Sequence, residues 1–309
     1  MSRQNYYHQR QVRQQETIDE ALVVELVKAE RRRQPRLGGR KLWRVLHREL
    51  EAAGVELGRD RFFALLKRQN LLIPRRKNAC RTTDSRHRFR VYGNLVKDRV
   101  LTGPHQVLVA DITYLRTAEG FMYLALVMDA FSRKVVGYDC SDSLEAQGAR
   151  RALKMALAQM PAGSQVVHHS DRGTQYCCQE YVALLEQAKA AISMTQENHC
   201  YENGKAERLN GILKQEYGLG ETIASKALAQ TMVKEAVQLY NEHRPHTALA
   251  YACPSEVHLA PDRGGMGGVM PVAGSLVLLE ATVANATVTP PPIPPLGSGA
   301  QARQVFVRT

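Results

Sequence analysis

Apolar residues recur at helical spacing through the first third of the chain. The pattern predicts three helices, over residues 17–33, 40–53 and 60–70, with a break at Pro35 and glycines between them. The side chains expected to be buried are Ile18, Leu22, Leu26 and Ala29 in the first helix, Leu42, Leu46 and Leu50 in the second, and Phe62, Phe63, Leu65 and Leu66 in the third. Short helices with a glycine-bearing turn and a basic outer face predict a helix-turn-helix-like DNA-binding region over residues 1–74. A plain helical docking domain is the alternative.

After about residue 100 the pattern changes to strand-like runs of apolar and β-branched residues. Three consecutive strands are predicted over residues 106–115, 121–130 and 134–140. The elements expected after them are a helix over 144–159, a strand over 165–169, a helix over 179–190, a strand over 192–195, a helix that begins at Asn203, and a helix over 222–241 with Leu228, Met232, Val233, Val237 and Tyr240 buried. Strands followed by alternating helices and strands predict an α/β domain over residues 101–260.

The helix that begins at Asn203 has two different faces. Ala206, Leu209 and Leu213 recur at helical spacing and form an apolar face, and Asn203 is a suitable N-cap residue. The polar face consists of Asn203, Glu207, Asn210 and Lys214, at positions i, i+4, i+7 and i+11. A carboxylate with amides on both sides is a candidate for a functional site, and a solvated helix face is the alternative.

Two further carboxylates occupy positions that suit metal chemistry. Asp111 interrupts a strand-like run, where an unpaired carboxylate is costly unless it binds a metal ion, and Asp171 follows a short strand. Thirty-five residues separate Asp171 from Glu207. Two aspartates and a helical glutamate in this layout are typical of a two-metal phosphoryl-transfer site, because Mg²⁺ prefers oxygen ligands. Asp129 is a competing ligand, although its place after a strand is more typical of a turn residue.

The charge is distributed unevenly along the chain. The formal net charge is +12, and residues 1–100 carry 25 Lys or Arg against 11 Asp or Glu. Residues 101–309 carry 17 against 19, so the basic excess lies in the first third. This distribution favours a polyanionic partner, since Lys and Arg that neutralise phosphates release counterions. A basic arm that only aids solubility is the alternative. Residues 75–100 are expected to be a basic linker.

Other features limit the class of protein. The six cysteines form no C-x-x-C pair and are expected to be reduced thiols. The first residues are polar and carry no signal peptide, and the longest apolar run, 121–128, is too short to cross a membrane. These observations predict a cytoplasmic protein. Residues 261–309 are rich in Pro and Gly and are expected to be a largely unfolded tail.

Four segments carry a resemblance to a known family. They read V-A-D-I-T-Y, H-S-D-R-G-T-Q-Y, C-Y-E-N-G-K-A-E-R and Y-N-E-H-R-P-H-T-A-L, in this order along the chain. They resemble the insertion-sequence transposases of the IS-three family, OrfB type, within the larger group of DDE transposases and retroviral integrases. The resemblance runs from about residue 36 to about residue 257. It implies an RNase H-like integrase core in which the first strand lies mid-sheet with the fourth beside it, so that Asp111 and Asp171 would be neighbours.

The resemblance also implies an activity, cofactors and partners. The expected activity is Mg²⁺-dependent cleavage and transfer of DNA strands at insertion-sequence ends, with Asp111, Asp171 and Glu207 as catalytic residues holding two ions, which Mn²⁺ could replace. Expected partners are the double-stranded DNA of the terminal repeats and target, further copies of the chain and the product of an upstream reading frame, in the nucleoid of a bacterium. The residues expected to contact DNA are Arg40, Lys41, Arg44, Arg61, Lys67, Arg68, Arg172, Asn203 and Lys214. A catalytically inactive DNA-binding remnant and an RNase H-like nuclease without strand transfer are the alternative functions.

Overall fold

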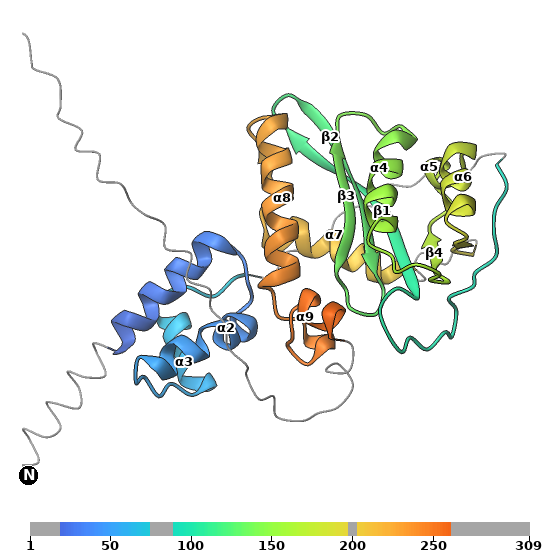
Figure 1. Cartoon of the computed structure of the whole chain (residues 1–309). Coiled ribbons are helices and arrows are strands. Elements are labelled where there is room, and N and C mark those ends of the chain that lie inside the picture. Colours follow the sequence, from blue (N-terminus) through green and yellow to red (C-terminus); the bar gives the residue numbers. More distant parts are fainter. Residues whose placement is uncertain (1–18, 75–88, 197–202, 261–309) are drawn as a thin grey trace, which may run out of the picture. The chain divides into compact units, whose positions relative to one another are not determined.

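A mixed β-sheet forms the centre of the α/β domain in the computed structural model, which describes residues 19–74, 89–196 and 203–260 (Figure 1). The strands run in the order β3-β2-β1-β4-β5, and the short β6 pairs with β1. Their bounds are β1 (Val107–Thr117), β2 (Gly120–Asp129), β3 (Val135–Ser141), β4 (Val167–Ser170), β5 (Ala191–Met194) and β6 (Thr222–Ile223). The first three strands are antiparallel, whereas β4 and β5 run parallel to β1. This is the RNase H-like arrangement, with β1 mid-sheet and β4 beside it, as predicted.

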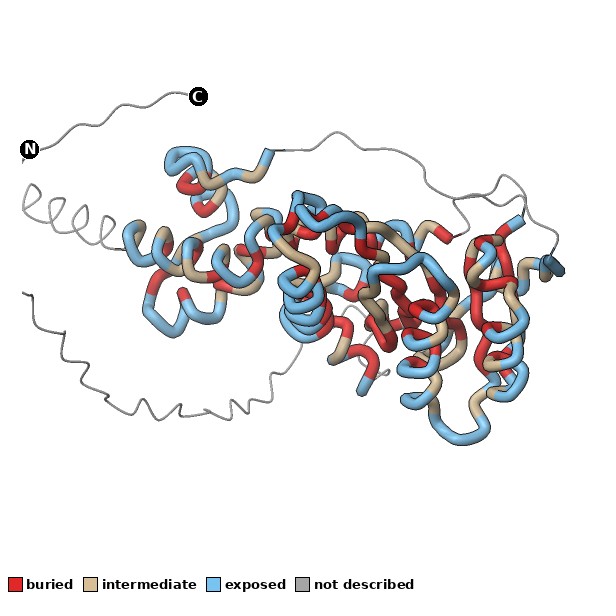
Figure 2. Tube along the Cα trace, turned by 90° about the horizontal axis from the view of Figure 1, so that it is seen from above, coloured by how far each residue is buried: buried red, intermediate tan, exposed pale blue. Residues whose placement is uncertain are grey.

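Helices cover both faces of this sheet because its strands are apolar on both sides. On β1, Val107 and Val109 pack with α7 (Gly204–Glu216) and α8 (Lys226–Glu242). The alternate residues Leu108 and Ala110 pack on the other face. That face is covered by α4 (Ala146–Leu157), α5 (Thr174–Cys177) and α6 (Gln179–Gln187). In Figure 2 the coiled segments accordingly have buried turns on one side and exposed turns on the other. The last elements of the described residues are η2 (Thr247–Leu249) and α9 (Pro254–Leu259).

The prediction was wrong about the start of α8. Thr222 and Ile223 form β6, which pairs with the end of β1, instead of opening the helix. The helix begins at Lys226, and the side chain of Ser225 caps it by accepting a hydrogen bond from the backbone N–H of Leu228. Leu228 itself is exposed, although a buried position was predicted for it. Residues 222–223 are strand because β1 offers them a partner, which local propensity does not show.

The N-terminal helices surround a small core of their own. Residues 19–33 are helical, followed by α2 (Gly39–Ala52) and α3 (Arg59–Arg68). Leu42, Leu46, Leu50, Phe62, Leu65 and Leu66 are buried, as predicted. In the first helix the prediction of the buried face was wrong, because Val23 and Val27 are buried while Leu22 is exposed. Residues 22–27 contain apolar side chains around most of the helix circumference, so periodicity alone did not select the face.

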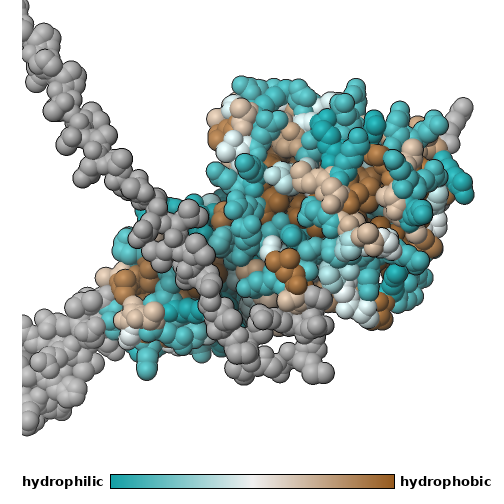
Figure 3. All heavy atoms as spheres, viewed as in Figure 1, coloured by the Kyte–Doolittle hydropathy of each residue, from teal (hydrophilic) through white to brown (hydrophobic). Residues whose placement is uncertain are grey.

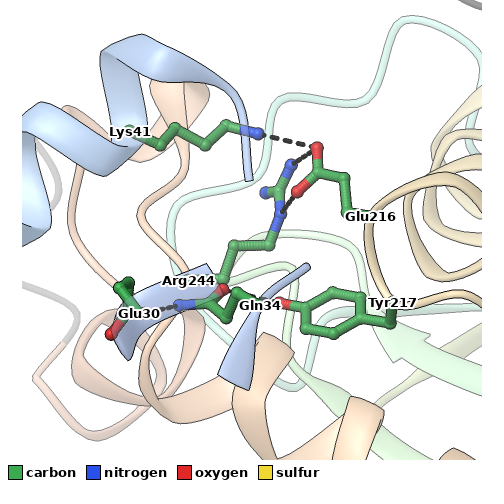
Figure 4. A network of polar contacts seen from close by, with 6 residues as sticks. All are labelled: Glu30, Gln34, Lys41, Glu216, Tyr217 and Arg244. Carbon is green, nitrogen blue, oxygen red and sulfur yellow. Dashed lines mark hydrogen bonds and ion pairs between the residues drawn. The ribbon is translucent and has the colours of Figure 1, made fainter. Parts of the chain in front are cut away.

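A buried polar network joins the N-terminal helices to the end of α7 (Figure 4). Glu216 accepts hydrogen bonds from Arg244 Nε and Nη2 at 2.7 and 2.8 Å and from Lys41 Nζ at 3.0 Å. Burial opposes ionisation of Glu216, but the bonds and charges of these cations outweigh it and lower its pKa. Arg244 is only 1% exposed, so its guanidinium depends on this carboxylate.

The same network includes a second chain of hydrogen bonds. Tyr217 donates its hydroxyl hydrogen to Gln34 Oε1 at 3.1 Å, and Gln34 Nε2 donates to Glu30 Oε1 at 2.7 Å. The backbone N–H of Arg36 also donates to the carbonyl of Glu216 at 3.1 Å. Lys41, which the sequence analysis assigned to DNA contact, is therefore held by a carboxylate of the α/β domain.

The remaining general expectations have mixed outcomes. No helix among the described residues has the length and apolar composition needed to cross a membrane. The face drawn in Figure 3 is largely hydrophilic, with scattered hydrophobic patches. Cys140, Cys177, Cys178 and Cys253 are free thiols, as predicted. Ile18, Cys80, Cys200, most of the basic linker and the whole of the tail 261–309 lie outside the described residues.

Candidate active site

The pairing of β1 with β4 brings Asp111 and Asp171 together. The parallel register aligns Val107 with Val167 and Val109 with His169. Two residues further on, the same register reaches Asp111 and Asp171, which follows the end of β4. Because side chains alternate along a strand, Asp111 lies on the same sheet face as Val109, the face that α7 covers.

Two hydrogen bonds fix the carboxylate of Asp111. Its Oδ1 accepts from the backbone N–H of Ile112 at 2.9 Å, and its Oδ2 accepts from Asn210 Nδ2 at 2.7 Å. Burial, followed by the negative charge of Asp171 and with a smaller contribution from Glu207, raises the pKa of Asp111 to about 7. The two hydrogen bonds oppose this rise. The carboxylate of Asp111 therefore interacts electrostatically with both other carboxylates of the predicted triad.

Glu207 is presented by the outward side of α7. The helix packs on the sheet through Ala206, Leu209, Ile212 and Leu213, while Glu207 is exposed. Asn203 is the N-cap residue, but the prediction that its side chain caps the helix was wrong. Its Nδ2 instead donates to the carbonyl of Ala110 at 3.1 Å, one residue before Asp111. The two asparagines thus attach α7 to β1 on either side of Glu207.

The loop after β4 holds Asp171 in a tight turn. Asp171 Oδ1 accepts a hydrogen bond from the backbone N–H of Gly173 at 2.9 Å. A Cβ atom at Gly173 would lie 3.0 Å from that oxygen and 3.1 Å from Gln175 Oε1, so a side chain there would disturb the carboxylate. Arg172 Nε donates to the carbonyl of Thr195 at 2.8 Å, which ties the turn to the segment after β5.

The chemistry of these donors fits a hard divalent cation. Carboxylate oxygens are the ligands that Mg²⁺ prefers, and mutual repulsion of the three carboxylates would be relieved by positive charge between them. Within residues 19–74, 89–196 and 203–260, however, no three His, Cys, Asp or Glu side chains are close enough together to form a ready-made metal cluster. The carboxylates are therefore coupled electrostatically without being gathered around one point.

The other polar residues near these strands have structural partners. Asp129 is buried and accepts hydrogen bonds from the backbone N–H groups of His105, Phe131 and Ser132, which agrees with its predicted turn role. His168 Nε2 lies 2.8 Å from the hydroxyl of Tyr181, and His169 Nδ1 lies 2.9 Å from Ser193 Oγ. Burial lowers the pKa of His168 to about 3, so this imidazole is neutral.

The residues expected to contact DNA occupy different environments. Those exposed on α2 and α3 are Arg40, Arg44, Arg61, Lys67 and Arg68. Arg68 also pairs with Glu20 at 2.5 Å. Asn203 is buried, and Lys214 is half-buried with its Nζ 4.5 Å from the centroid of the Tyr114 ring. Burial lowers the pKa of Lys214, while the charge of Asp111 opposes that effect. Lys214 therefore lies close enough to Asp111 for the two charges to interact.

Comparison with known proteins identifies the family. Residues 102–200 and 188–254 match two families, each described as "Integrase core domain". The chain is 32% identical over 259 residues to the "Insertion element IS600 uncharacterized 31 kDa protein" of Shigella sonnei, which covers 82% of this chain and 94% of that protein. It is also 36% identical over 201 residues to transposase InsF for insertion sequence IS3A of Escherichia coli K12, covering 64% of this chain and 70% of that protein. The chain belongs to the IS3 family of DDE transposases.

The family assignment confirms the resemblance noted in the sequence. As an IS3-family member the chain is a polynucleotidyl transferase, an enzyme that cleaves DNA strands and transfers their ends with the help of divalent metal ions. Among solved structures, the HTLV-2 integrase catalytic core domain in complex with magnesium has a TM-score of 0.41 at 18% identity, covering 50% of this chain and 97% of that chain.

The sequence placed Asn210 on the polar face of the candidate helix, but it was not among the predicted catalytic, metal or DNA-contact residues. Its place three residues after Glu207 on the polar face of the helix was visible, but nothing in the sequence showed which partner its amide would meet. The structure supplies that partner as Asp111 Oδ2.

The raised pKa of Asp111 predicts a pH-dependent stability of the metal-free protein. A carboxyl group with a pKa of about 7 instead of its ordinary 3.8 stabilises the fold fully only below the lower value, and the contribution is lost as pH rises through the higher one. Asp111→Asn cannot ionise, so its free energy of unfolding should exceed that of the parent increasingly between pH 4 and 8, by at most about 4 kcal/mol. Urea unfolding in EDTA at pH 5 and pH 8 measures this difference. A difference that is the same at both pH values would contradict the expectation.

Proposed function

We propose that Asp111, Asp171 and Glu207 hold two divalent ions, Mg²⁺ in the cell, and that with them the protein cleaves and joins DNA at the ends of an insertion sequence. The observation that carries this proposal is the β1–β4 register that makes neighbours of Asp111 and Asp171, together with the pKa of Asp111, which burial and then the charges of Asp171 and Glu207 raise to about 7. A site that concentrates negative charge on hard oxygen donors suits divalent cations.

The division of work among these residues follows from their positions. When bound, the ions would supply Lewis-acid activation of the attacking hydroxyl and charge stabilisation of the leaving oxygen. Asp111 would contribute to both ion sites, because the charges of both Asp171 and Glu207 act on its carboxylate. Asp171 would complete the first and Glu207 the second. In cleavage the oxygen of water attacks the phosphorus and the 3′ oxygen leaves; in joining, a DNA 3′-hydroxyl attacks and the new phosphodiester replaces one in the target.

The proposal includes the partners of the reaction. Terminal-repeat and target DNA would bind through the basic residues of α2, α3 and the linker, and further copies of the chain would assemble on the paired ends. The product of an upstream reading frame is an additional proposed partner. The inactive-remnant alternative is disfavoured by the retention of all three carboxylates.

One assay tests this function. The purified chain is incubated with duplex DNA carrying the sequences that flank its own gene, with Mg²⁺, Mn²⁺, Ca²⁺ or EDTA. Cleavage at the element's ends and joining to a target should require Mg²⁺ or Mn²⁺. Cleavage without joining would favour the nuclease alternative, and DNA binding without either reaction would favour the inactive remnant.

Lys214 is proposed to bind a phosphate near the scissile bond. It lies two helical turns after Glu207, about 10 Å along α7, and the charge of Asp111 acts on its ammonium. Lys214→Ala should weaken binding of the cleaved end about ten-fold or more, because a charge-assisted hydrogen bond is removed, and leave the metal requirement unchanged. Lys226→Ala is the matched control, since Lys226 Nζ lies 3.9 Å from Asp142 on another part of the domain. Equal end binding by the two variants would show that Lys214 is an ordinary surface lysine.

A further inference from the structure

Asn210 is a buried amide in contact with the first carboxylate of the proposed triad. Asn210 is only 8% exposed, and its Nδ2 donates a hydrogen bond to Asp111 Oδ2 at 2.7 Å. Together with the backbone N–H of Ile112, which donates to Oδ1, this bond restrains both oxygens of Asp111. A carboxylate held at both oxygens has one orientation, and orientation decides which lone pairs are available to a metal ion.

The other half of the Asn210 amide has no partner. A carboxylate oxygen accepts hydrogen bonds, so the nitrogen of the amide faces Asp111 and Oδ1 is turned away from it. In the described part of the chain this buried Oδ1 forms no hydrogen bond. Buried polar atoms are nearly always paired, so an unpaired amide oxygen on a side chain that contacts Asp111 points to a group that the protein chain itself does not supply.

A purely structural asparagine in the same domain shows the contrast. Asn241 is also 8% exposed, but both halves of its amide are satisfied by the backbone of Val135. Its Oδ1 accepts from the N–H at 2.8 Å, and its Nδ2 donates to the carbonyl at 2.9 Å. Asn203, which attaches α7 to the carbonyl of Ala110, also has a buried Oδ1 that is unpaired within the described residues. Both incomplete amides therefore lie next to Asp111, whereas the complete pairing belongs to Asn241 on α8.

We propose that Asn210 is a positioning residue of the metal site. Its Nδ2–H holds Asp111 in the orientation that binds the cation, and its Oδ1 accepts a hydrogen bond from a water molecule on that cation. The inference rests on the proposed function, because it takes Asp111 as a metal ligand. It assigns to the amide a role in metal affinity that a helix-to-sheet contact alone would not have.

The test measures Mn²⁺ binding to the full-length protein at fixed pH by electron paramagnetic resonance of the free ion. Asn210→Ala and Asn210→Ser should each bind Mn²⁺ about 10–100-fold more weakly, the usual consequence of removing a partner of a metal ligand. Asn241→Ala is the matched control, since it removes an equally buried amide and should lower resistance to urea without changing Mn²⁺ affinity. The serine variant guards against misfolding of the alanine variant, and circular dichroism checks both.

Asp111→Asn in the same titration separates the two proposals. Strong loss of Mn²⁺ binding in Asp111→Asn, with parent-like affinity in both Asn210 variants, would overturn the role of Asn210 and leave the proposed function intact. Unchanged Mn²⁺ affinity in Asp111→Asn would overturn the proposed function and this inference with it. In strand cleavage at saturating Mn²⁺, the Asn210 variants should lower kcat and leave KM for the DNA end nearly unchanged.

Discussion

Asp111→Asn, Asp171→Asn and Glu207→Gln should each reduce strand cleavage about a thousand-fold or more while DNA binding persists. Each change removes one negative charge and one metal ligand from a site in which catalysis is mainly electrostatic. The effect should be of similar size at all three positions, because the loss of either ion leaves the attacking or the leaving oxygen without stabilisation. DNA binding should survive, since neutralising a carboxylate lowers repulsion toward phosphate.

The measurement is single-turnover cleavage of a labelled end with Mg²⁺, beside a gel-shift titration of the same DNA in Ca²⁺. Asp142→Asn and Glu235→Gln are suitable controls because both side chains are exposed and neither residue belongs to the candidate site. They make the same changes of charge and shape and should cleave like the parent. Parent-like cleavage by any one of the three triad variants would remove that residue from the proposed site.

Neutralising Arg40, Arg44 and Lys67 together should weaken binding of DNA ends and make that binding less sensitive to salt. The three side chains are exposed on α2 and α3. A cation that binds a phosphate releases counterions, so the slope of log affinity against log salt should become shallower by about one for every phosphate-binding side chain that is removed. Lys41 is left unchanged, because its ammonium already pairs with Glu216 and its removal would disturb the buried Arg244.

The experiment compares the triple glutamine variant with a control in which Lys154, Lys189 and Lys234 are replaced by glutamine. The control residues are exposed on the α/β domain and change the net charge by the same amount. Affinities are measured between 50 and 200 mM salt, the range over which the affinity of a protein that binds several phosphates falls by about 10³–10⁵. Identical slopes for the two triple variants would show that α2 and α3 do not carry the DNA-binding surface.

The sequence by itself was sufficient for the order of the longer elements and for selecting the three carboxylates, but α5, β6, η2 and α9 were not predicted. Alternation and helical spacing predicted β1 to β5, α2 to α4, α6 and α7 with modest errors at their ends. They did so because the buried face of each element makes apolar residues recur at regular intervals along the sequence. Asp111 was readable as a candidate because an unpaired carboxylate inside a strand is costly. Asp171 and Glu207 were selected by their places after a strand and on the polar face of a helix, with 35 residues between them. Their roles stay a prediction.

Only the tertiary structure shows which strands pair with each other and which helix faces are buried. Pairing of β1 with β4 makes neighbours of two aspartates separated by 59 residues, and pairing with β1 turns residues 222–223 into a strand. Val23 and Val27 are buried and Leu22 is exposed. The helix has apolar side chains on several sides, and its packing against α2 and α3 determines which of them are buried. Local sequence carries no signal for such long-range contacts.

The same limit applies to the buried polar groups. Arg244 ends a helix and Lys41 begins a basic one, and neither position reveals that the two share Glu216. Asn210 occupies the same face as Glu207 in the sequence, but its bond to Asp111 arises only when α7 lies across β1. Hydrogen bonds are short and directional, so their partners are determined by the packed geometry, whereas burial depends on hydrophobic pattern and is visible along the chain.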